Sequence, residues 1–252
     1  MRCPDIYPWI TPLGKGYTMH EAMILIEKDE KIPEEVIKWA ESHSVPIEFC
    51  PDGPDTDIDE LSDIKEGFRY DYVITYSSDI SLDYLEIMYC HSHDLSAVIG
   101  TSDRLIVREI APSDLDRYQE LIEAFPDAVS DSTLLGLKKE EFLKRHLAYI
   151  KYSYHFSGYG IYGIFLKEGG QMIGIAGVDG TDAPTLSYAL FKEYQGKGYA
   201  YEACRIVLEH MKNNLSVSEI KVNVKKENTG SLHLAKKLGE AFPGLIEINI
   251  IS

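Results

Sequence analysis

The chain reads Tyr188-Ala189-Leu190-Phe191-Lys192-Glu193-Tyr194-Gln195-Gly196-Lys197-Gly198-Tyr199-Ala200 in its second half. The apolar start of this stretch predicts a strand, and the two glycines predict a tight loop. A helix follows, because apolar residues recur at helical spacing at Ala200, Ala203, Cys204, Val207, Leu208 and Met211. The free N–H groups of a helix's first turn favour an anion, and glycines let one approach the backbone closely. The stretch therefore indicates a site for phosphate or pyrophosphate.

Two common phosphate-binding motifs do not fit this loop. A P-loop needs Gly-Lys-Ser/Thr, and the Rossmann fingerprint needs a glycine where Tyr201 stands. A glycine pair before a helix can also serve the backbone alone. From the loop by itself, phosphate binding and a purely structural turn are both open.

The segments around the loop predict an α/β domain over residues 103–252. We expect strands at 105–110, 160–166, 172–178, 185–191, 220–224 and 245–250. We expect helices after Ser113, over 138–150, from Gly198 onward, and from Ser231 to Leu238, where Gly239 would stop the last of them. Ser113 and Asp116 have the spacing of a capping box. The aromatic residues between 149 and 162 either pack in the core or line an acceptor pocket.

The loop and its neighbours resemble the GNAT superfamily, the acyl-CoA-dependent N-acyltransferases, especially its ribosomal-protein-alanine-acetyltransferase-like branch. Gln195-x-x-Gly198-x-Ala200 matches the signature Gln/Arg-x-x-Gly-x-Gly/Ala, and Asn228-Thr229-Gly230-Ser231 follows the next expected strand. The resemblance covers residues 103–252. It implies the fold of that family, a mixed sheet flanked by helices.

The resemblance also implies a site for acetyl-CoA as the acyl donor, without a metal. The amides of Gly196, Lys197, Gly198, Tyr199 and Ala200 would hold the pyrophosphate, Gln195 would position the loop, and Asn228 would bind the pantetheine arm. The main chain of Leu190 would contact pantetheine, and its N–H would polarise the thioester carbonyl. Ser231 would help to protonate the leaving thiolate. The Lys197 ammonium could meet a phosphate of CoA.

The proton-transfer groups depart from the family pattern. Ala235 stands where related enzymes often have a general-acid tyrosine, which leaves Ser231 as the nearby candidate acid. A serine at that position fits a helix N-cap equally well. The branch often has a glutamate early in the strand before the loop, where this chain has Thr185 and Leu186.

No general base is assigned from the sequence. Tyr188, Glu193 and Asp179 are candidates by proximity alone, and a chain of water molecules is another route for the proton. The family closes its sheet with a pair of strands, whereas we expect one strand after Gly239. A second copy of the chain could complete that edge, so a homodimer is compatible with the sequence.

Residues 1–102 predict a second, smaller α/β domain. Strands are expected at 22–27, 45–49, 72–76 and 95–99, with helices from Pro33 and over 81–89. Strands that alternate with helices favour a parallel sheet. Gly100-Thr101-Ser102 is the expected boundary between the two domains.

The net charge of −16 lies almost wholly in this first part. Residues 1–102 hold 21 acidic and 7 basic residues, whereas residues 103–252 hold 20 acidic and 18 basic ones. Because phosphate contacts need clustered lysine and arginine, this balance argues against nucleic acid as a partner. The asymmetry indicates two parts with different tasks, and the task of the acidic part is not assigned.

Composition and spacing exclude other classes of protein. The longest apolar runs, such as 22–26, are far shorter than the ~18–20 residues of a membrane helix, and the first residues carry no apolar signal region. The four cysteines lie far apart, which argues against a zinc site or a disulfide framework. Asp55, Asp57, Asp59 and Glu66 fit a calcium loop, but its sixth position, which needs glycine, is Glu60. We expect a cytoplasmic protein with no metal and no membrane partner.

These observations predict an N-acetyltransferase that moves an acetyl group from acetyl-CoA to a primary amine, on a small molecule or at a peptide amino terminus. Positioning and carbonyl polarisation would supply most of the catalysis. The alternative is a non-catalytic acyl-CoA-binding protein that regulates or recruits a partner through its acidic domain. The missing tyrosine and glutamate favour this alternative.

Overall fold

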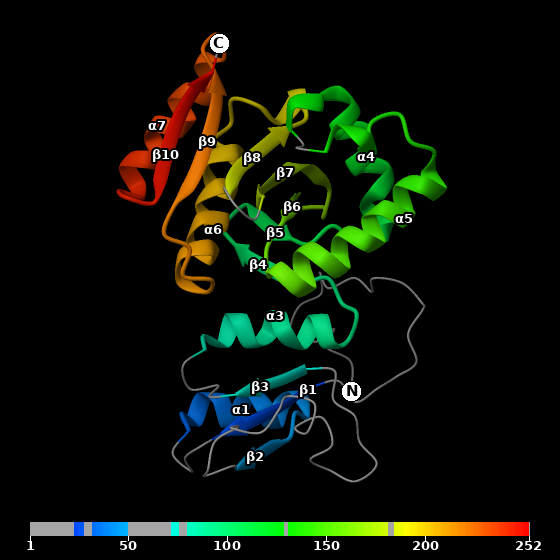
Figure 1. Cartoon of the computed structure of the whole chain (residues 1–252), viewed down its shortest axis with the longest axis vertical. Helices are drawn as coiled ribbons and strands as arrows, with labels where there is room; N and C mark the ends of the chain where they lie inside the picture. Colours follow the sequence, from blue (N-terminus) through cyan, green and yellow to red (C-terminus); the bar gives the residue numbers. More distant parts are fainter. Residues whose placement is uncertain are drawn as a thin grey trace. The chain divides into compact units, whose positions relative to one another are not determined.

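The structure, a computed structural model, describes residues 23–27, 32–49, 72–75, 80–128, 131–180 and 184–251. The chain forms two compact units, which divide between Ala97 and Val98. Figure 1 labels the helices and strands of both units. The acidic stretch from Asp55 to Glu66, with its resemblance to a calcium loop, lies outside the described residues.

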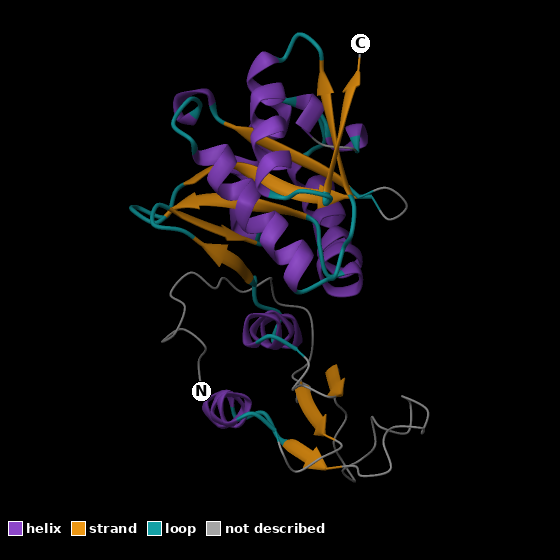
Figure 2. Cartoon of the chain, turned by 90° about the vertical axis from the view of Figure 1, so that its left-hand side faces the viewer, coloured by secondary structure: helices purple, strands orange, loops and turns teal. Residues whose placement is uncertain are grey.

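The first unit contains a three-stranded sheet with the order β2-β1-β3. Strand β1 (Met23–Glu27) pairs in parallel with both β2 (Ile47–Phe49) and β3 (Tyr72–Thr75). Helices α1 (Glu34–His43) and α3 (Leu82–Ser92) lie on the same side of these strands (Figure 2). The predicted small parallel sheet is confirmed.

The two helices of the first unit meet at Glu86. One carboxylate oxygen of Glu86 accepts a hydrogen bond of 2.9 Å from Trp39 Nε1 and lies 3.1 Å from His43 Nε2. The rings of Trp39 and His43 stack with their centroids 4.7 Å apart, and Tyr89 packs edge-on against His43. This polar and aromatic contact fixes α1 against α3.

The second unit is built on a seven-stranded sheet with the order β10-β9-β8-β7-β6-β5-β4. Its strands are β4 (Val98–Thr101), β5 (Leu105–Arg108), β6 (Ile161–Leu166), β7 (Met172–Asp179), β8 (Thr185–Leu190), β9 (Ile220–Lys225) and β10 (Ile246–Ile251). Neighbours are antiparallel from β4 to β8, whereas β8, β9 and β10 run parallel. This is the mixed sheet that the sequence predicts.

Strand β4 corrects one expectation. The strand expected at 95–99, as the last of the first domain, begins at Val98 and pairs antiparallel with β5. The N–H of Ser102 donates to the carbonyl of Leu105 at 2.9 Å and closes the turn between the two strands. Because strands joined by so short a turn pair with each other, β4 belongs to the second sheet.

Helices cover both faces of the seven-stranded sheet (Figure 1). On one face, α4 (Leu115–Ala124) and α5 (Lys139–Tyr149) enclose a core with Ile106, Phe142, Phe165, Ile175 and Phe191. On the other face lie α6 (Tyr199–Asn213) and α7 (Thr229–Ala241). The apolar stripe predicted for α6 is confirmed as its buried side, with Ala203, Cys204, Val207, Leu208 and Met211 all fully buried.

The start of α4 differs from the expected capping box. A short 3-10 turn, Pro112–Asp114, precedes the helix, and the Asp114 carboxylate accepts the N–H of Ala111 at 2.8 Å. The same carboxylate accepts two N–H groups of the buried Arg108, at 2.8 and 3.0 Å. The turn therefore begins two residues earlier than expected, with Ala111 as its N-cap, and Asp114 supplies the carboxylate expected of Asp116. The buried Arg108 guanidinium holds Asp114 there, because it needs a charged partner.

A π-helix, Ile150–Ser157, continues from α5 and contains part of the aromatic stretch. The Tyr149 hydroxyl accepts the N–H of Ile161 at 2.7 Å, and the buried Tyr154 hydroxyl donates to the carbonyl of the same residue. The rings of Tyr154 and Tyr162 stack with their centroids 5.6 Å apart. These three tyrosines therefore pack in the core and anchor the start of β6.

Helix α7 continues through Gly239 and ends at Ala241, two residues beyond the expected stop. Leu238 is fully buried, and its carbonyl accepts the N–H of Phe242 at 2.9 Å. The burial of Leu238 thus stabilises the helix beyond Gly239, although local propensity alone predicts that the helix ends there. The closing strand expected at 245–250 is β10, which pairs in parallel with β9.

Gly177 and Gly239 provide a matched test of this packing. A Cβ at Gly177 would lie 2.1 Å from the carbonyl oxygen of Gly160 and 2.5 Å from Cα of Ile161, so backbone would have to move. We expect Gly177→Ala to lower the free energy of unfolding by about 2 kcal/mol or more. At Gly239 the nearest atom would be 3.7 Å away, and Gly239→Ala should raise that free energy by about 0.5–1 kcal/mol. Urea denaturation measures both, and equal stabilities would contradict the close approach at Gly177.

Candidate functional site

Strands β8 and β9 separate almost as soon as they meet. Strand β8 pairs with β7 along its whole length, from Thr185 to Leu190. It pairs with β9 only where Thr185 lies opposite Lys221. Beyond this position the strands diverge, and the edge of β8 that faces β9 has no further ladder pair among the described strands.

The ladder with β7 fixes which backbone groups of β8 point into the gap. The N–H of Phe191 donates to the carbonyl of Ile173 at 3.0 Å, in register with the β7–β8 pairs. Residues 185, 187 and 189 therefore bond to β7 in the alternation of an antiparallel pair. The N–H and C=O groups of Leu186, Tyr188 and Leu190 point the other way, toward β9. The bridge at Thr185 uses the Leu186 N–H, and Gln195 binds the Leu190 carbonyl, so the groups of Tyr188 and the N–H of Leu190 are the ones that open to the gap.

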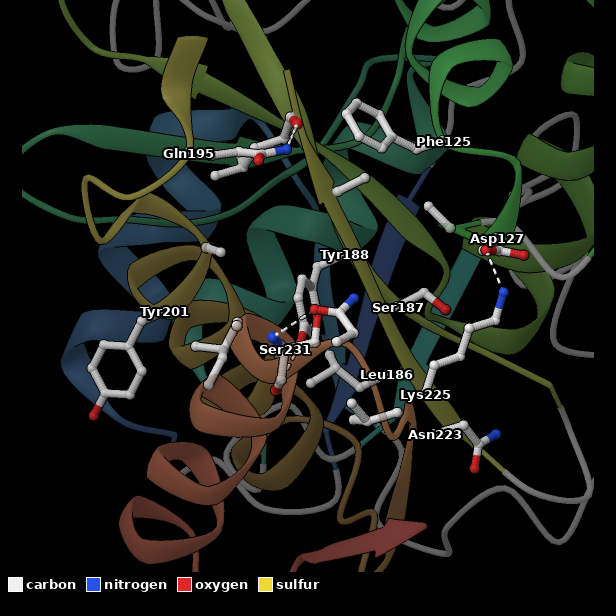
Figure 3. A pocket seen from close by; sticks show the side chains of 18 of the residues that line it. Phe125, Asp127, Leu186, Ser187, Tyr188, Gln195, Tyr201, Asn223, Lys225 and Ser231 are labelled. Carbon is white, nitrogen blue, oxygen red and sulfur yellow. Dashed lines mark hydrogen bonds and ion pairs between the residues drawn. The ribbon is translucent and has the colours of Figure 1, made fainter. Parts of the chain in front are cut away.

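A pocket of about 1180 Å³ occupies this gap. On the side of α6 and α7 its lining includes Tyr188, Gly198, Tyr201, Asn228, Ser231 and Lys237. On the side of α4 it includes Phe125, Asp127, Ser187, Asn223 and Lys225, which lie across β8 from Tyr188 and Ser231 (Figure 3). Residues from both faces of the sheet thus reach one pocket. Two molecules can approach the same strand from opposite faces.

The loop after β8 exposes a row of backbone N–H groups. Gly196 and Gly198 have φ angles of 72° and 84°, a region that is costly for other residues. Gln195 Nε2 donates to the Leu190 carbonyl at 2.9 Å and ties the loop to the end of β8. The first backbone bond of α6 runs from Glu202 N–H to the Gly198 carbonyl, at 3.2 Å. Within the described part of the chain, no group accepts the N–H groups of residues 196–201, which leaves them for a ligand.

Arg104 holds this loop from the neighbouring β4–β5 hairpin. Its Nη1 donates to the Lys197 carbonyl at 3.2 Å, and its Nε donates to Glu202 at 3.0 Å. The guanidinium also lies 4.5 Å from the centroid of the Tyr199 ring. Partial burial acts to raise the pKa of Glu202, but hydrogen bonds from Arg104 and Ser102 hold it below its usual value. Sequence analysis gave Arg104 no role, since nothing local links it to a loop more than 90 residues away.

Asn228 caps helix α7. Its Oδ1 accepts the N–H of Ser231 at 3.0 Å, which is the usual geometry of an N-cap. The interpretation of Ser231 as the N-cap is therefore wrong, and the serine lies in the first turn with its side chain half-buried at the pocket. Ala235, one turn further on, is fully buried.

Tyr188 extends from β8 toward the first turn of α7. Its hydroxyl donates to the Ser231 carbonyl at 3.3 Å, and its side chain lines the pocket. Burial raises the pKa of Tyr188 to about 12. Tyr188 therefore stays protonated at neutral pH, which makes it unsuitable as the general base for which the sequence left it a candidate.

The two carboxylates considered as bases lie in different surroundings. Asp179, at the end of β7, lines the pocket. Glu193 is exposed outside the pocket lining, and its Oε1 lies 3.6 Å from Arg117 Nη2. Asp127, which sequence reasoning did not consider, also lines the pocket and forms a 2.7 Å ion pair with Lys225.

Two lysines contact tyrosine rings in or beside the glycine loop and the first turn of α6. The Lys197 ammonium is 5.6 Å from the centroid of the Tyr194 ring, and Lys197 is outside the pocket lining. Lys237 lines the pocket, with its ammonium 4.0 Å from the centroid of the Tyr201 ring. Sequence reasoning missed Lys237, although its spacing from Gly230 and Leu234, two other pocket residues, places all three on one face of α7.

Other reactive groups are sparse in the part of the chain that the structure describes. It contains no group of three or more histidine, cysteine or carboxylate side chains placed to hold a metal. None of its helices is both long enough and apolar enough to span a bilayer. Cys90 and Cys204 are buried and lie outside any disulfide. Burial raises the pKa of Cys204, which makes a thiolate nucleophile unfavourable there.

Comparison with known proteins gives one family. A family model described as the acetyltransferase (GNAT) domain matches residues 104–240. An acetyltransferase structure from Agrobacterium tumefaciens is 23% identical and has a TM-score of 0.46, with 56% of this chain and 81% of that chain covered. A ribosomal-protein-S5-alanine acetyltransferase from Vibrio fischeri is 20% identical, with 58% and 82% covered and a TM-score of 0.49. The coenzyme A complex of RimL, a ribosomal L7/L12 alpha-N-protein acetyltransferase, is 19% identical, with 56% and 81% covered and a TM-score of 0.47.

The Asn228 cap predicts a stability effect that is separate from any ligand. We expect Asn228→Ala to lower the free energy of unfolding by about 1 kcal/mol, because the Ser231 N–H loses its acceptor. Asn228→Ser should keep most of the stabilisation that the cap provides, because a serine hydroxyl can also accept this N–H. Asn223→Ala, at an exposed position of β9 on the same pocket, should change it by less than about 0.5 kcal/mol. Thermal unfolding compares the three variants. Equal losses for Asn228→Ala and Asn223→Ala would contradict the capping role.

Proposed function

Because this chain belongs to the GNAT acetyltransferase family, whose domains transfer acyl groups from acyl-CoA, we propose that it moves the acetyl group of acetyl-CoA onto a primary amine. The amine belongs to a small molecule or to a peptide amino terminus. The observation that carries this proposal is the pocket between β8 and β9, which residues of both sheet faces line. The donor enters from the side of α6 and α7, and the amine from the side of α4.

The loop 195–200 fits the pyrophosphate of the donor. A Cβ at Gly196 would meet no atom within 4 Å, so a ligand has room to approach the backbone. The N–H groups of residues 196–200 have no acceptor among the described residues, and the positive end of α6 adds to their attraction for an anion. We assign Lys237, which lines the pocket, as the cation of this end, in place of Lys197, which does not.

The free edge of β8 fits the pantetheine arm, which carries amide groups that can pair with a strand. Asn228 uses its Oδ1 for the helix cap and presents its Nδ2 to this arm. The N–H of Leu190 points into the gap, and we assign it to the thioester carbonyl, where developing negative charge needs a donor. One such donor lowers the activation free energy of the reaction by on the order of 3 kcal/mol.

Side chains at the middle of the pocket serve the proton transfers. Ser231, in the first turn of α7, donates a hydrogen bond to the departing sulfur and helps to protonate it. Asp179, on the pocket wall opposite Thr185 and far along β8 from Leu190, takes the proton of the amine through a chain of water molecules. Holding the amine and the thioester together in one pocket supplies the remaining acceleration.

One experiment tests the function as a whole. Calorimetry with acetyl-CoA measures donor binding, and release of the CoA thiol measures turnover with an alanyl tripeptide, 1,4-diaminobutane and kanamycin. We expect binding and turnover with at least one of these amines. Binding without turnover on any amine would favour the non-catalytic alternative, and the absence of binding would contradict both.

Gly198 and Gly169 give a matched test of the donor site. Both have a φ of 84°, so a larger side chain strains both backbones alike, but only Gly198 lines the pocket. We expect Gly198→Trp to weaken acetyl-CoA binding by tenfold or more, which is about 1.4 kcal/mol, because the ring covers the N–H groups. Gly169→Trp, in the turn before β7 with open space around it, should bind as the wild type does. Calorimetric Kd values decide, and equal binding by both variants would overturn the assignment.

Variants of Asp179 and Glu193 test which carboxylate serves as the base. We expect Asp179→Asn to lower kcat on the order of 100-fold, since it removes the proton acceptor from the pocket. Glu193→Gln, which alters an exposed carboxylate beside Arg117, should leave kcat unchanged. Steady-state rates with saturating acetyl-CoA measure both. A normal kcat for Asp179→Asn would leave water as the route for the proton.

A further inference from the structure

Tyr188 combines three features at the middle of the pocket. Its side chain lines the cavity, its hydroxyl lies 3.3 Å from the Ser231 carbonyl, and its main chain points into the gap between β8 and β9. Figure 3 shows the Tyr188 ring beside Ser231, between the strand and the start of α7. The phenol therefore lies beside the path that we assign to pantetheine, on the donor side of β8.

The other tyrosines of the pocket are engaged elsewhere. Three tyrosines line it within the described residues: Tyr188, Tyr199 and Tyr201. The Tyr199 ring lies under the Arg104 guanidinium, and the Tyr201 ring lies under the Lys237 ammonium. Both belong to the start of α6, at the pyrophosphate end. Tyr188 is thus the phenol that lies along the strand itself.

We propose that Tyr188 is the general acid that gives its proton to the sulfur of the leaving CoA. The inference rests on the proposed function. The Ser231 carbonyl accepts the phenol hydrogen bond before reaction and so holds the hydroxyl at the first turn of α7. The Ser231 hydroxyl then gives a second hydrogen bond to the same sulfur.

The step balances without an additional reagent. The amine nitrogen forms a bond to the acyl carbon, and the C–S bond breaks with its electron pair leaving on sulfur. The proton of the Tyr188 hydroxyl passes to that sulfur and gives the CoA thiol. The proton that the amine loses reaches Asp179 or water and then restores the phenol. One proton leaves nitrogen and one reaches sulfur in each turnover.

The protonation state of the phenol suits this role. Burial keeps Tyr188 protonated across the neutral range, so the donor is present in essentially every molecule. A phenol is also a much stronger acid than an aliphatic hydroxyl, so it passes a proton to a thiolate more readily than Ser231 does. The assignment makes Tyr188 the main donor and Ser231 its support.

Tyr188→Phe removes the proton and keeps the ring. We expect its kcat to fall on the order of 100-fold with the amine that the wild type uses best, while the KM and calorimetric Kd for acetyl-CoA change by less than about twofold. Ser231→Ala should lose less than Tyr188→Phe. The matched control is Tyr194→Phe, which removes a similar bond, from a phenol to Gln171 Oε1 at 3.0 Å, between two residues that do not line the pocket.

Each outcome of this comparison is decisive. A kcat for Tyr188→Phe within threefold of the wild type would overturn the assignment, and so would a loss confined to KM, which indicates a role in binding alone. An equal loss in Tyr194→Phe would mean that losing a phenol hydrogen bond matters only for the fold, and this too would overturn the assignment. A wild type without turnover on any of the three amines would instead overturn the proposed function, together with this inference.

Discussion

The second unit depends on the one edge of strand β8 that has no strand beside it. A backbone N–H or C=O group buried without a partner is costly, so a strand normally continues its ladder. Strand β8 does so with β7 but leaves β9 after Thr185. The N–H and C=O groups of Tyr188 and the N–H of Leu190 then face a cavity, and a ligand that bonds like a strand can complete them. The same separation opens the sheet to residues of both faces, from Asp127 on one side to Ser231 on the other.

The rest of the site is arranged around this edge by rigid elements. Gln195 ties the loop to the last carbonyl of β8, and Arg104 ties the same loop to the β4–β5 hairpin. Two glycines with positive φ turn the chain so that the first N–H groups of α6 face outward. Asn228 fixes the first turn of α7 against which the Tyr188 hydroxyl is held. Preorganised donors of this kind need no rearrangement when charge develops, which is why they suit acyl transfer.

Sequence reasoning succeeded where the signal was local. The stripe of α6 repeats over three turns and is buried as expected, and the strand–loop–helix order around Gly198 is observed as quoted. It failed where a distant residue changed a local preference. Ser113 had the spacing of a cap, but the buried Arg108 made Asp114 the partner of that turn. Gly239 had the properties of a helix stop, but burial of Leu238 carried α7 beyond it.

By itself, the sequence determined the glycine loop, the amphipathic helix behind it and the family to which they belong, since these depend on neighbours within a few turns. Only the tertiary structure decided which groups share the pocket. Tyr188 meets Ser231 across 43 positions of the chain, Arg104 reaches Glu202 across 98, and Asp179 enters the pocket where Glu193 does not. Such pairs are set by strand order and by the divergence of β8 from β9. Periodicity in the sequence cannot predict such pairs. It shows which face of a helix or strand is buried, but not which other element packs against that face.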